Sequence, residues 1–305
     1  MTNENPLVKA RKQLKSLLWE LPITGDYLQG RYLRQHFSTE MELIKGNARN
    51  GSGHPSIIHF SVNKAATQYV RDLLRRCIAG TGMISVGLAE YAFHTDFPYL
   101  DTLSAAEMQQ YQHIFQPTGY LYSVFGGMIE GIANLEKYRV VLMVRDPRDV
   151  LVSEYFSIAY SHSEPSLRGN KYQEFMKMRQ QARQITVDEY VAGECDRVHA
   201  TYSRYMDLLL DDYPHVHVAK YETMTHEFQT WLDRLLEYCG LEISDQLRQD
   251  VLREAARIQP KRENIQQHIR KGKPGDHKEK LKPETVERLN SKFSDVLKRF
   301  QYPLH

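Results

Sequence analysis

The sequence predicts an α/β fold: a single domain with a central, mainly parallel sheet flanked by helices. Residues 57–62 form an apolar strand that passes through a loop of small residues into an amphipathic helix. Residues 139–145, RVVLMVR, are a continuous apolar run ending in charge, which is typical of a strand buried on both faces. Strand patterns then alternate with helix patterns, and this alternation favours parallel strands joined by right-handed crossovers.

The chain begins with a segment that predicts a basic amphipathic helix. Residues 7–19 place Leu, Val and Trp at roughly helical spacing, with Lys and Arg between them. Such a helix can lie on a membrane surface, but docking on its own domain is the more common arrangement. Residues 45–56 are a turn-rich linker. We therefore expect residues 1–50 to be an N-terminal helical extension packed on a main domain of residues 51–305.

Residues 56–76 form a P-loop-like strand–loop–helix that is suited to binding an anion. The first amides of a helix lack internal partners, and the helix dipole adds partial positive charge there. Lys64 supplies an ammonium group and Thr67 a hydroxyl, while Ala65 and Ala66 keep the loop slim. The segment predicts a phosphate-bearing ligand near Lys64.

The remaining elements follow from apolar runs, capping patterns and glycine stops. Ser104 with Glu107, and Thr186 with Glu189, form capping-box patterns that mark helix starts. Asp146-Pro147 opens a further helix, because proline is favoured in the first turn. The other predicted strands span residues 83–86, 119–125 and 216–222, and the other predicted helices span residues 128–135, 186–210, 224–238, 244–258 and 283–300.

Composition limits the environment and the partners. A net charge of +2 over 305 residues argues against nucleic acid or an anionic membrane surface as the main partner. Three widely spaced cysteines (Cys77, Cys195 and Cys239) fit a reducing compartment. The first residues lack the apolar core of a signal peptide, and no stretch approaches the roughly 20 apolar residues of an integral membrane segment. We expect a cytoplasmic protein.

Three more segments suit a ligand site, and two of them fall at the carboxyl ends of predicted strands, where ligands bind in open parallel sheets. Arg145 ends the apolar run and suits bidentate phosphate binding, and Ser153 lies two turns into the following helix. Tyr221 ends another strand and can line a base. The fourth piece is the basic, glycine-containing RKGKPGDHK of residues 270–278. Each piece alone fits an ordinary surface or core position, but their order on one sheet predicts a joint nucleotide site.

Together these motifs resemble a cytosolic-type sulfotransferase that uses 3′-phosphoadenosine 5′-phosphosulfate (PAPS) and releases 3′-phosphoadenosine 5′-phosphate (PAP). The resemblance spans residues 57–280 and is most specific in RKGKPGDHK, which keeps each fixed position of the RKGxxGDWK motif except Trp, here His277. It implies that residues 61–67 hold the 5′-phosphosulfate, and that Arg145 and Ser153 hold the 3′-phosphate. The residues to which it assigns the nucleotide are Asn63, Lys64, Ala65, Ala66, Thr67, Gln68, Arg145, Ser153, Tyr221, Arg270, Lys271 and Gly272.

The chain departs from the family pattern at two places. The family loop commonly has Gly-Thr-Thr where this chain has Ala65-Ala66-Thr67. Alanine cannot replace the first threonine hydroxyl, so one hydrogen-bond donor is missing. The His of the family's THxP segment is also missing, because the corresponding residues read LYSVFGG. Related enzymes of the same fold use a Glu after the first helix. That relation makes Glu90 the first candidate for the general base and His94 the second.

The resemblance implies in-line sulfuryl transfer without a metal, to a hydroxyl or amine of a small-molecule acceptor. Lys64 would stabilise charge on the leaving 5′-phosphate, and Ser153 would hold Lys64 back until the acceptor binds. Aromatic and acidic residues within residues 88–125 and 155–183 favour an aromatic or cationic acceptor. One alternative function is a P-loop kinase, but such a kinase would carry the motif GxxxxGK[ST], which this loop lacks. A second alternative is a nucleotide-binding module that has no catalytic activity. The C-terminal residues show no clear match to the dimerisation motif of related enzymes.

Overall fold

The five predicted strands form one parallel sheet. The computed structural model describes residues 22–47, 50–162, 170–257 and 272–304. Within these ranges the strand order is β2-β3-β1-β4-β5, and every pairing is parallel. The strands are β1 (Ile57–Ser61), β2 (Ile84–Val86), β3 (Tyr120–Phe125), β4 (Arg139–Val144) and β5 (His217–Lys220). The predicted fold class is confirmed.

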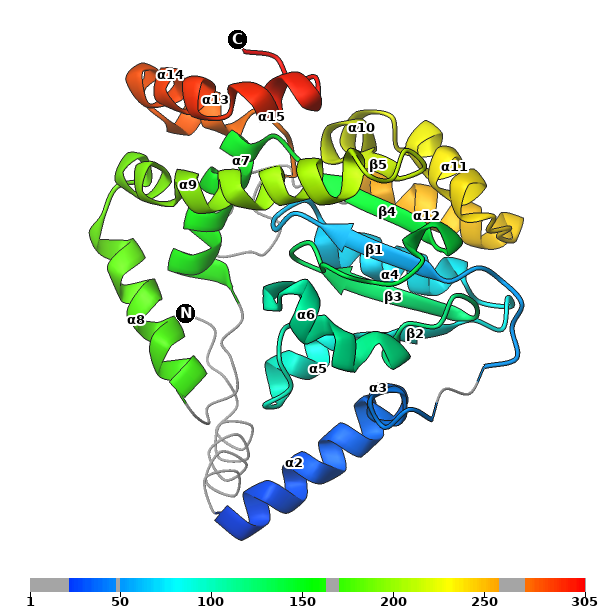
Figure 1. The fold of residues 1–305 in the computed structure, drawn as a ribbon. Helices are drawn as coiled ribbons and strands as arrows, with labels where there is room; N and C mark the ends of the chain where they lie inside the picture. The colour runs from blue at the N-terminus through cyan, green and yellow to red at the C-terminus, as the bar shows by residue number, and fades with distance from the viewer. Residues whose placement is uncertain (1–21, 48–49, 163–169, 258–271, 305) are drawn as a thin grey trace.

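Helices cover both faces of this sheet (Figure 1). Val141 and Met143 of β4 face a core shared with α4 (Thr67–Cys77), α11 (Phe228–Cys239) and α12 (Asp245–Arg257). Val140 and Leu142 face the opposite core, which is shared with α7 (Pro147–Phe156), α9 (Val187–Tyr205), α14 (Pro283–Lys292) and α15 (Ser294–Arg299). Because successive strand residues point to opposite faces, the continuous apolar run of β4 fills both cores at once.

The other helices lie around this three-layer arrangement. They are α2 (Pro22–His36), α3 (Ser38–Ile44), α5 (Leu88–His94), α6 (Ala105–Met108), α8 (Asn170–Gln184), α10 (Tyr221–His226) and α13 (Asp276–Lys280). Short 3-10 turns occupy Leu100–Thr102, Gln109–Ile114 and Leu135–Lys137. The π-helical turns Ser157–Ser161 and Met206–Leu210 extend α7 and α9.

Both predicted capping boxes are confirmed. The Ser104 hydroxyl accepts from the Glu107 amide at 3.4 Å, and the Thr186 hydroxyl accepts from the Glu189 amide at 3.2 Å. The helix expected over residues 128–135 is wrong. Gly131 and Asn134 have φ angles of 76° and 53°, which break a right-handed helix, and only the 3-10 turn Leu135–Lys137 forms.

The expected N-terminal helix of residues 7–19 lies outside the described residues. The neighbouring helices α2 and α3 contact α5: the Gln29 side chain donates to the His94 carbonyl at 3.1 Å. The buried Glu40 carboxylate accepts from the Gly87 amide at 2.6 Å. The division of the chain at residue 50 stays a prediction.

The strand order reverses direction between β1 and β4. From β1 the chain crosses to β2 and β3 on one side, whereas from β4 it continues to β5 on the other. The loops that follow β1 and β4 therefore diverge and leave a crevice at the carboxyl edge of the sheet. Ligands of open α/β sheets usually bind in the crevice at such a reversal of strand order.

Candidate active site

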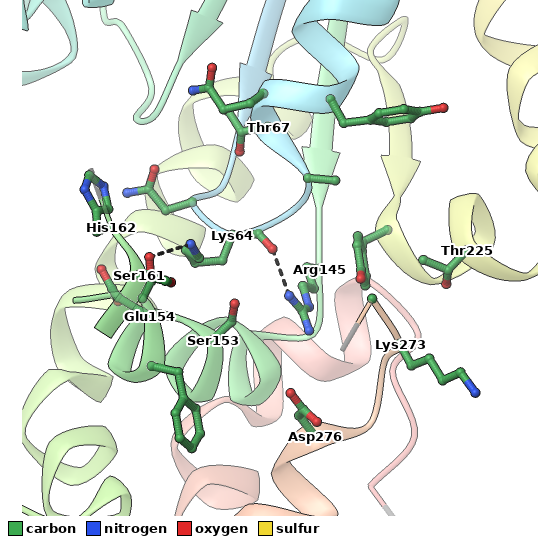
Figure 2. A pocket seen from close by; sticks show the side chains of 18 of the residues that line it. Lys64, Thr67, Arg145, Ser153, Glu154, Ser161, His162, Thr225, Lys273 and Asp276 are labelled. Carbon is green, nitrogen blue, oxygen red and sulfur yellow. Dashed lines mark hydrogen bonds between the residues drawn. The ribbon is translucent and has the colours of Figure 1, made fainter. Parts of the chain in front are cut away.

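A cavity of about 680 Å³ lies at this edge of the sheet. Its lining comes from the loop after β1, from α7 and its π-helical turn, and from α8, α10, α11 and residues 272–276 (Figure 2). Segments far apart in the sequence therefore meet around one space. Most of the residues assigned to the nucleotide line it, namely Asn63, Lys64, Ala66, Thr67, Gln68, Arg145, Ser153, Tyr221 and Gly272. Ala65 is fully buried and does not line the cavity.

The loop after β1 has an unusual backbone. Lys64 and Ala66 have φ angles of 68° and 59°, in the left-handed region that glycine enters most easily. Alternating backbone handedness of this kind turns successive amides toward one point and forms a concave anion site. Ala66 precedes the first residue of α4, Thr67, whose hydroxyl is 2.9 Å from that of Ser61.

The left-handed conformation of Ala66 also changes the alignment with the family loop. A glycine of the family pattern fits best where φ is positive, and that residue here is Ala66 rather than Ala65. Thr67 and Gln68 then occupy the two threonine positions. Gln68, which has an amide side chain and no hydroxyl, lines the cavity.

Lys64 points along the cavity toward α7. Its Nζ donates to the Ser157 hydroxyl at 2.9 Å (Figure 2). Burial, followed by the charge of Arg145, lowers the pKa of Lys64 to about 8, while Glu154 acts in the opposite direction. We expected Ser153 to hold the Lys64 ammonium. Ser153 lines the cavity four residues before Ser157, but the Lys64 ammonium bonds to Ser157.

Arg145 provides a second, buried cation. Its side chain donates from Nη1 to the Lys64 carbonyl at 2.9 Å and lies over the Tyr221 ring, 4.3 Å from the centroid. Nη2 is 3.8 Å from an Asp149 carboxylate oxygen. Arg145 is only 5% exposed, and its Nε has no hydrogen-bond partner among the described residues. A buried guanidinium on a cavity wall favours an anionic ligand.

The side of the cavity near Tyr221 is mostly apolar. Tyr69, Met224, Phe228 and Ala255 line it together with Tyr221. Planar and apolar surfaces of this kind are suited to hold an aromatic base next to a cation that binds phosphate.

The opposite end of the cavity combines apolar and ionisable groups. Phe156, Ile158, Phe175 and Met178 line it, and His162 lies on the same wall. The Glu154 carboxylate also reaches this end, where Arg197 donates to it at 2.6 Å. Figure 2 shows Lys64, Glu154 and His162 around this part of the cavity.

The two expected base candidates lie elsewhere. Glu90 pairs with Arg71 at 3.2 Å and with Arg75 at 3.8 Å, and its side chain is 42% exposed. His94 packs its ring 5.5 Å from that of Tyr32. Neither residue lines the cavity, and their assignment as the general base stays a prediction.

The other sequence-predicted residues fall into three groups: outside the described residues, in the core, and on the cavity wall. Arg270 and Lys271 lie outside the described residues. Tyr122 and Phe125, expected near the acceptor, are core residues of β3. Phe156 does line the cavity.

Sequence reasoning missed three residues of this region. Ser157 begins the π-helical turn and His162 directly follows it, and a π-helical turn has no simple sequence signal. Asp149 is fully buried beside Arg145. Asp149 lies in the sequence RDPRD of residues 145–149, where an acidic residue also suits the first turn of a helix and so gives no specific signal.

Three further features bear on function. Within the described residues, no group of three His, Cys, Asp or Glu side chains is placed to hold a metal ion. In that same part of the chain no helix is long and apolar enough to cross a membrane. Cys77, Cys195 and Cys239 are buried free thiols.

Comparison with solved structures returns distant matches. A mouse sulfotransferase, SULT7A1 complexed with PAP, is 14% identical, covers 84% of this chain and 87% of its own, and has a TM-score of 0.48. A retinol dehydratase in a complex with retinol and PAP is 15% identical, covers 84% of each chain, and has a TM-score of 0.44. Comparison with curated proteins finds no significant match.

The family comparison gives a clearer result. The model of the sulfotransferase domain matches residues 129–301, which is more than half of the chain. The matched region includes β4 with Arg145, α7, β5, Tyr221 and the segment that ends at His277. These elements build much of the cavity described above. The chain belongs to the sulfotransferase domain family.

Proposed function

We propose that this sulfotransferase moves the sulfuryl group of PAPS to a hydroxyl or amine of a small-molecule acceptor. The observation that carries the proposal is the pair of cations on one cavity. Lys64, in the loop after β1, and the buried Arg145, at the end of β4, both line it. A donor nucleotide with phosphate groups at both ends of its ribose matches two separated cations and the apolar wall of Tyr69, Tyr221 and Phe228.

The chemistry is a single displacement at sulfur. A bond forms between the acceptor oxygen or nitrogen and sulfur, the bond from sulfur to the bridging oxygen of the 5′-phosphate breaks, and PAP leaves with the electron pair. Lys64 and the first amides of α4 stabilise the charge that develops on that oxygen. Arg145 and Ser153 bind the 3′-phosphate, and Tyr221 lines the adenine.

The acceptor occupies the end of the cavity that Phe156, Phe175 and Met178 line. These side chains suit an acceptor with an aromatic or extended apolar body. The Glu154 carboxylate is compatible with a cationic group on that acceptor, although Arg197 already neutralises much of its charge. Residues 51–305 form the catalytic domain of a cytoplasmic enzyme, in keeping with three reduced, buried thiols.

Substitution of Lys64 tests the catalytic role. We expect Lys64→Ala to lower kcat by at least about 10²-fold, because the leaving group loses its charge partner. The measurement is mass-detected sulfate transfer from PAPS to a screen of alcohols, phenols and amines. Lys45→Ala removes an exposed lysine that pairs with Glu42 and serves as the control. Unchanged turnover in Lys64→Ala would refute the proposal, and tight ATP binding with no binding of PAP would favour the kinase alternative.

Three substitutions assign the general base. Glu90 and His94 come from the family relation, whereas His162 lies on the cavity wall near Lys64. The variants Glu90→Gln, His94→Gln and His162→Gln keep similar side-chain volumes. Loss of a positioned base should lower kcat about 10²- to 10⁴-fold without changing PAP affinity. The variant that shows this loss, together with loss of the acidic limb of the pH profile, identifies the base, because a general base must be deprotonated to act.

A further inference from the structure

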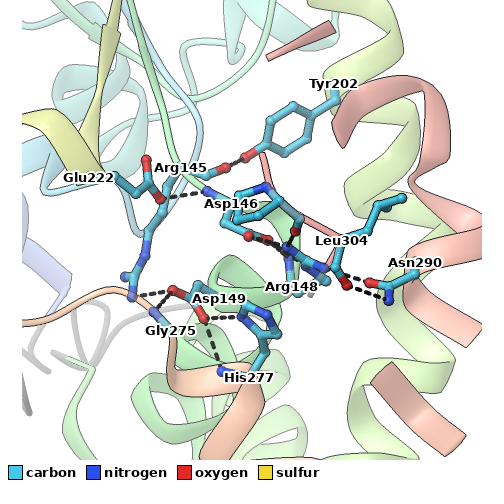
Figure 3. Close-up of polar contacts among 11 residues, drawn as sticks. Arg145, Asp146, Arg148, Asp149, Tyr202, Glu222, Gly275, His277, Asn290 and Leu304 are labelled. Carbon is cyan, nitrogen blue, oxygen red and sulfur yellow. Dashed lines mark hydrogen bonds and ion pairs between the residues drawn. The ribbon is translucent and has the colours of Figure 1, made fainter. Parts of the chain in front are cut away.

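Asp149 has more backbone and side-chain partners than a capping residue requires. It lies in the first turn of α7 and is 0% exposed. One oxygen accepts from the Gly275 amide at 2.6 Å. The other accepts from the His277 amide at 2.9 Å and from His277 Nδ1 at 2.7 Å (Figure 3). The carboxylate therefore anchors the segment that begins α13 to the first turn of α7.

The same carboxylate faces the nucleotide cavity through Arg145. Arg145 Nη2 is 3.8 Å from the oxygen that binds the Gly275 amide. Burial alone would raise the pKa of Asp149, but the hydrogen bond from His277 and the charge of Arg145 lower it to about 2. Asp149 is thus ionised at every working pH, and it links Arg145 to the chain that carries Gly272 and Lys273 along the cavity wall.

His277 contributes one donor to this arrangement. Because Asp149 can only accept, Nδ1 of His277 carries the proton. Its Nε2 has no hydrogen-bond partner within the ranges that the structure describes, and the side chain is 3% exposed. The side chain of residue 277 therefore needs a single N–H donor at the Nδ1 position, close enough to reach the Asp149 carboxylate.

We propose that Asp149 and His277 are positioning residues that make the site selective for a nucleotide with a 3′-phosphate. They do so by fixing Arg145 and residues 272–275 relative to each other. Neither residue lines the cavity, so each acts through Arg145 and the segment it holds. This inference rests on the proposed function, because it assigns the 3′-phosphate to the Arg145 side of the cavity.

A buried carboxylate beside a guanidinium can also serve stability alone. The structural role and the positioning role predict different changes in nucleotide affinity when the pair is substituted. A purely structural pair would weaken all nucleotides together, or none, once the variants are folded. A positioning pair weakens only the nucleotide that reaches Arg145, since the 5′-phosphate lies on the loop after β1.

The test measures dissociation constants for PAP and for adenosine 5′-phosphate, which lacks the 3′-phosphate, by calorimetry on the full chain. We expect Asp149→Asn and His277→Leu to weaken PAP binding about 10- to 100-fold, because a charge-assisted contact loses its geometry. Binding of adenosine 5′-phosphate should stay within about twofold. His277→Asn restores a donor at the Nδ1 position and should bind PAP like the unmodified chain.

Asn290→Ala is the matched control. Asn290 is hydrogen-bonded to Arg148 and to the Leu304 carbonyl in the neighbouring polar cluster, which does not touch the cavity (Figure 3). This variant should lower the melting temperature and leave the ratio of the two dissociation constants unchanged. Should Asp149→Asn fail to fold, the His277→Leu and His277→Asn pair decides the question.

Two results would overturn the inference. One is an equal change for PAP and adenosine 5′-phosphate in the folded variants, or no change for either. The other is His277→Asn behaving like His277→Leu, which would remove the role of the Nδ1 donor. An unmodified chain that binds PAP no better than adenosine 5′-phosphate would instead refute the proposed function, and this inference with it.

Discussion

At the scale of single residues, Lys64 combines a binding role with a shifted ionisation. Its positive φ angle turns the loop backbone toward the cavity, and its side chain reaches Ser157. Burial and Arg145 lower the pKa of Lys64 to about 8. An anion bound beside it reverses this effect, because the opposite charge favours the protonated amine.

This coupling predicts that PAP binding takes up a proton above pH 8. Affinity should be nearly constant below pH 8 and should fall by up to about tenfold per pH unit above it, because the free Lys64 amine must be protonated first. Calorimetry at pH 8.5, in buffers of different ionisation enthalpy, measures the uptake. Lys64→Arg keeps its charge at this pH and should show no uptake. The same uptake in Lys64→Arg would contradict the assignment to Lys64.

At the scale of elements, the junction of α7 with its π-helical turn determines which hydroxyl meets Lys64. The turn Ser157–Ser161 widens the helix after Phe156, and π-helical turns often occur at functional sites. Ser157 is buried and accepts from Lys64, while Ser153 lines the cavity one turn earlier. The two hydroxyls therefore have separate positions along the cavity.

Ser157→Ala should release Lys64 and raise hydrolysis of PAPS in the absence of acceptor. Loss of one hydrogen bond of about 1 kcal/mol corresponds to about a fivefold increase. Hydrolysis is followed as release of PAP, and PAP affinity should stay within about twofold. Ser153→Ala should weaken PAP binding without this increase. If Ser153→Ala alone raised hydrolysis, Ser153 would be the residue that restrains Lys64.

At the scale of the whole molecule, the central strand β1 contains a buried titratable residue, His59. His59 is fully buried, and its Nδ1 lies 2.9 Å from the Ser123 hydroxyl of β3. Burial, and then the charge of Arg71, lower the pKa of His59 to about 3. The native state therefore holds this imidazole neutral, whereas the unfolded chain protonates it near pH 6.5.

The free energy of unfolding should therefore fall as the pH drops below about 6.5. Between about pH 3 and pH 6.5 the unfolded state binds the extra proton, so His59 contributes a slope of up to about 1.4 kcal/mol per pH unit. Above this window its contribution is constant. Urea unfolding at several pH values between about 4.5 and 7.5 measures the slope in the unmodified chain and in His59→Asn. Equal slopes in both proteins would show that other groups cause the loss.

Particular elements explain how much of the fold the sequence could predict. The strands β1 and β4 are mainly apolar and are followed by Lys64 and Arg145, so their type and their place at the centre were predictable. The capping boxes at Ser104 and Thr186 were predictable because they depend on residues three positions apart. The helix expected over residues 128–135 failed because Gly131 and Asn134 adopt positive φ angles that an apolar pattern does not reveal.

By itself the sequence determined the strands, their ends and the cationic and aromatic residues that line the cavity. These are local properties, set by apolar runs, small loop residues and charges next to each other in the chain. Only the tertiary structure decided which groups meet: Lys64 with Ser157, Arg145 with Asp149, and Asp149 with His277. It also placed Glu90 on Arg71. Such pairings depend on how segments that are far apart in the sequence pack around one cavity, and the spacing of residues along the chain does not indicate this packing.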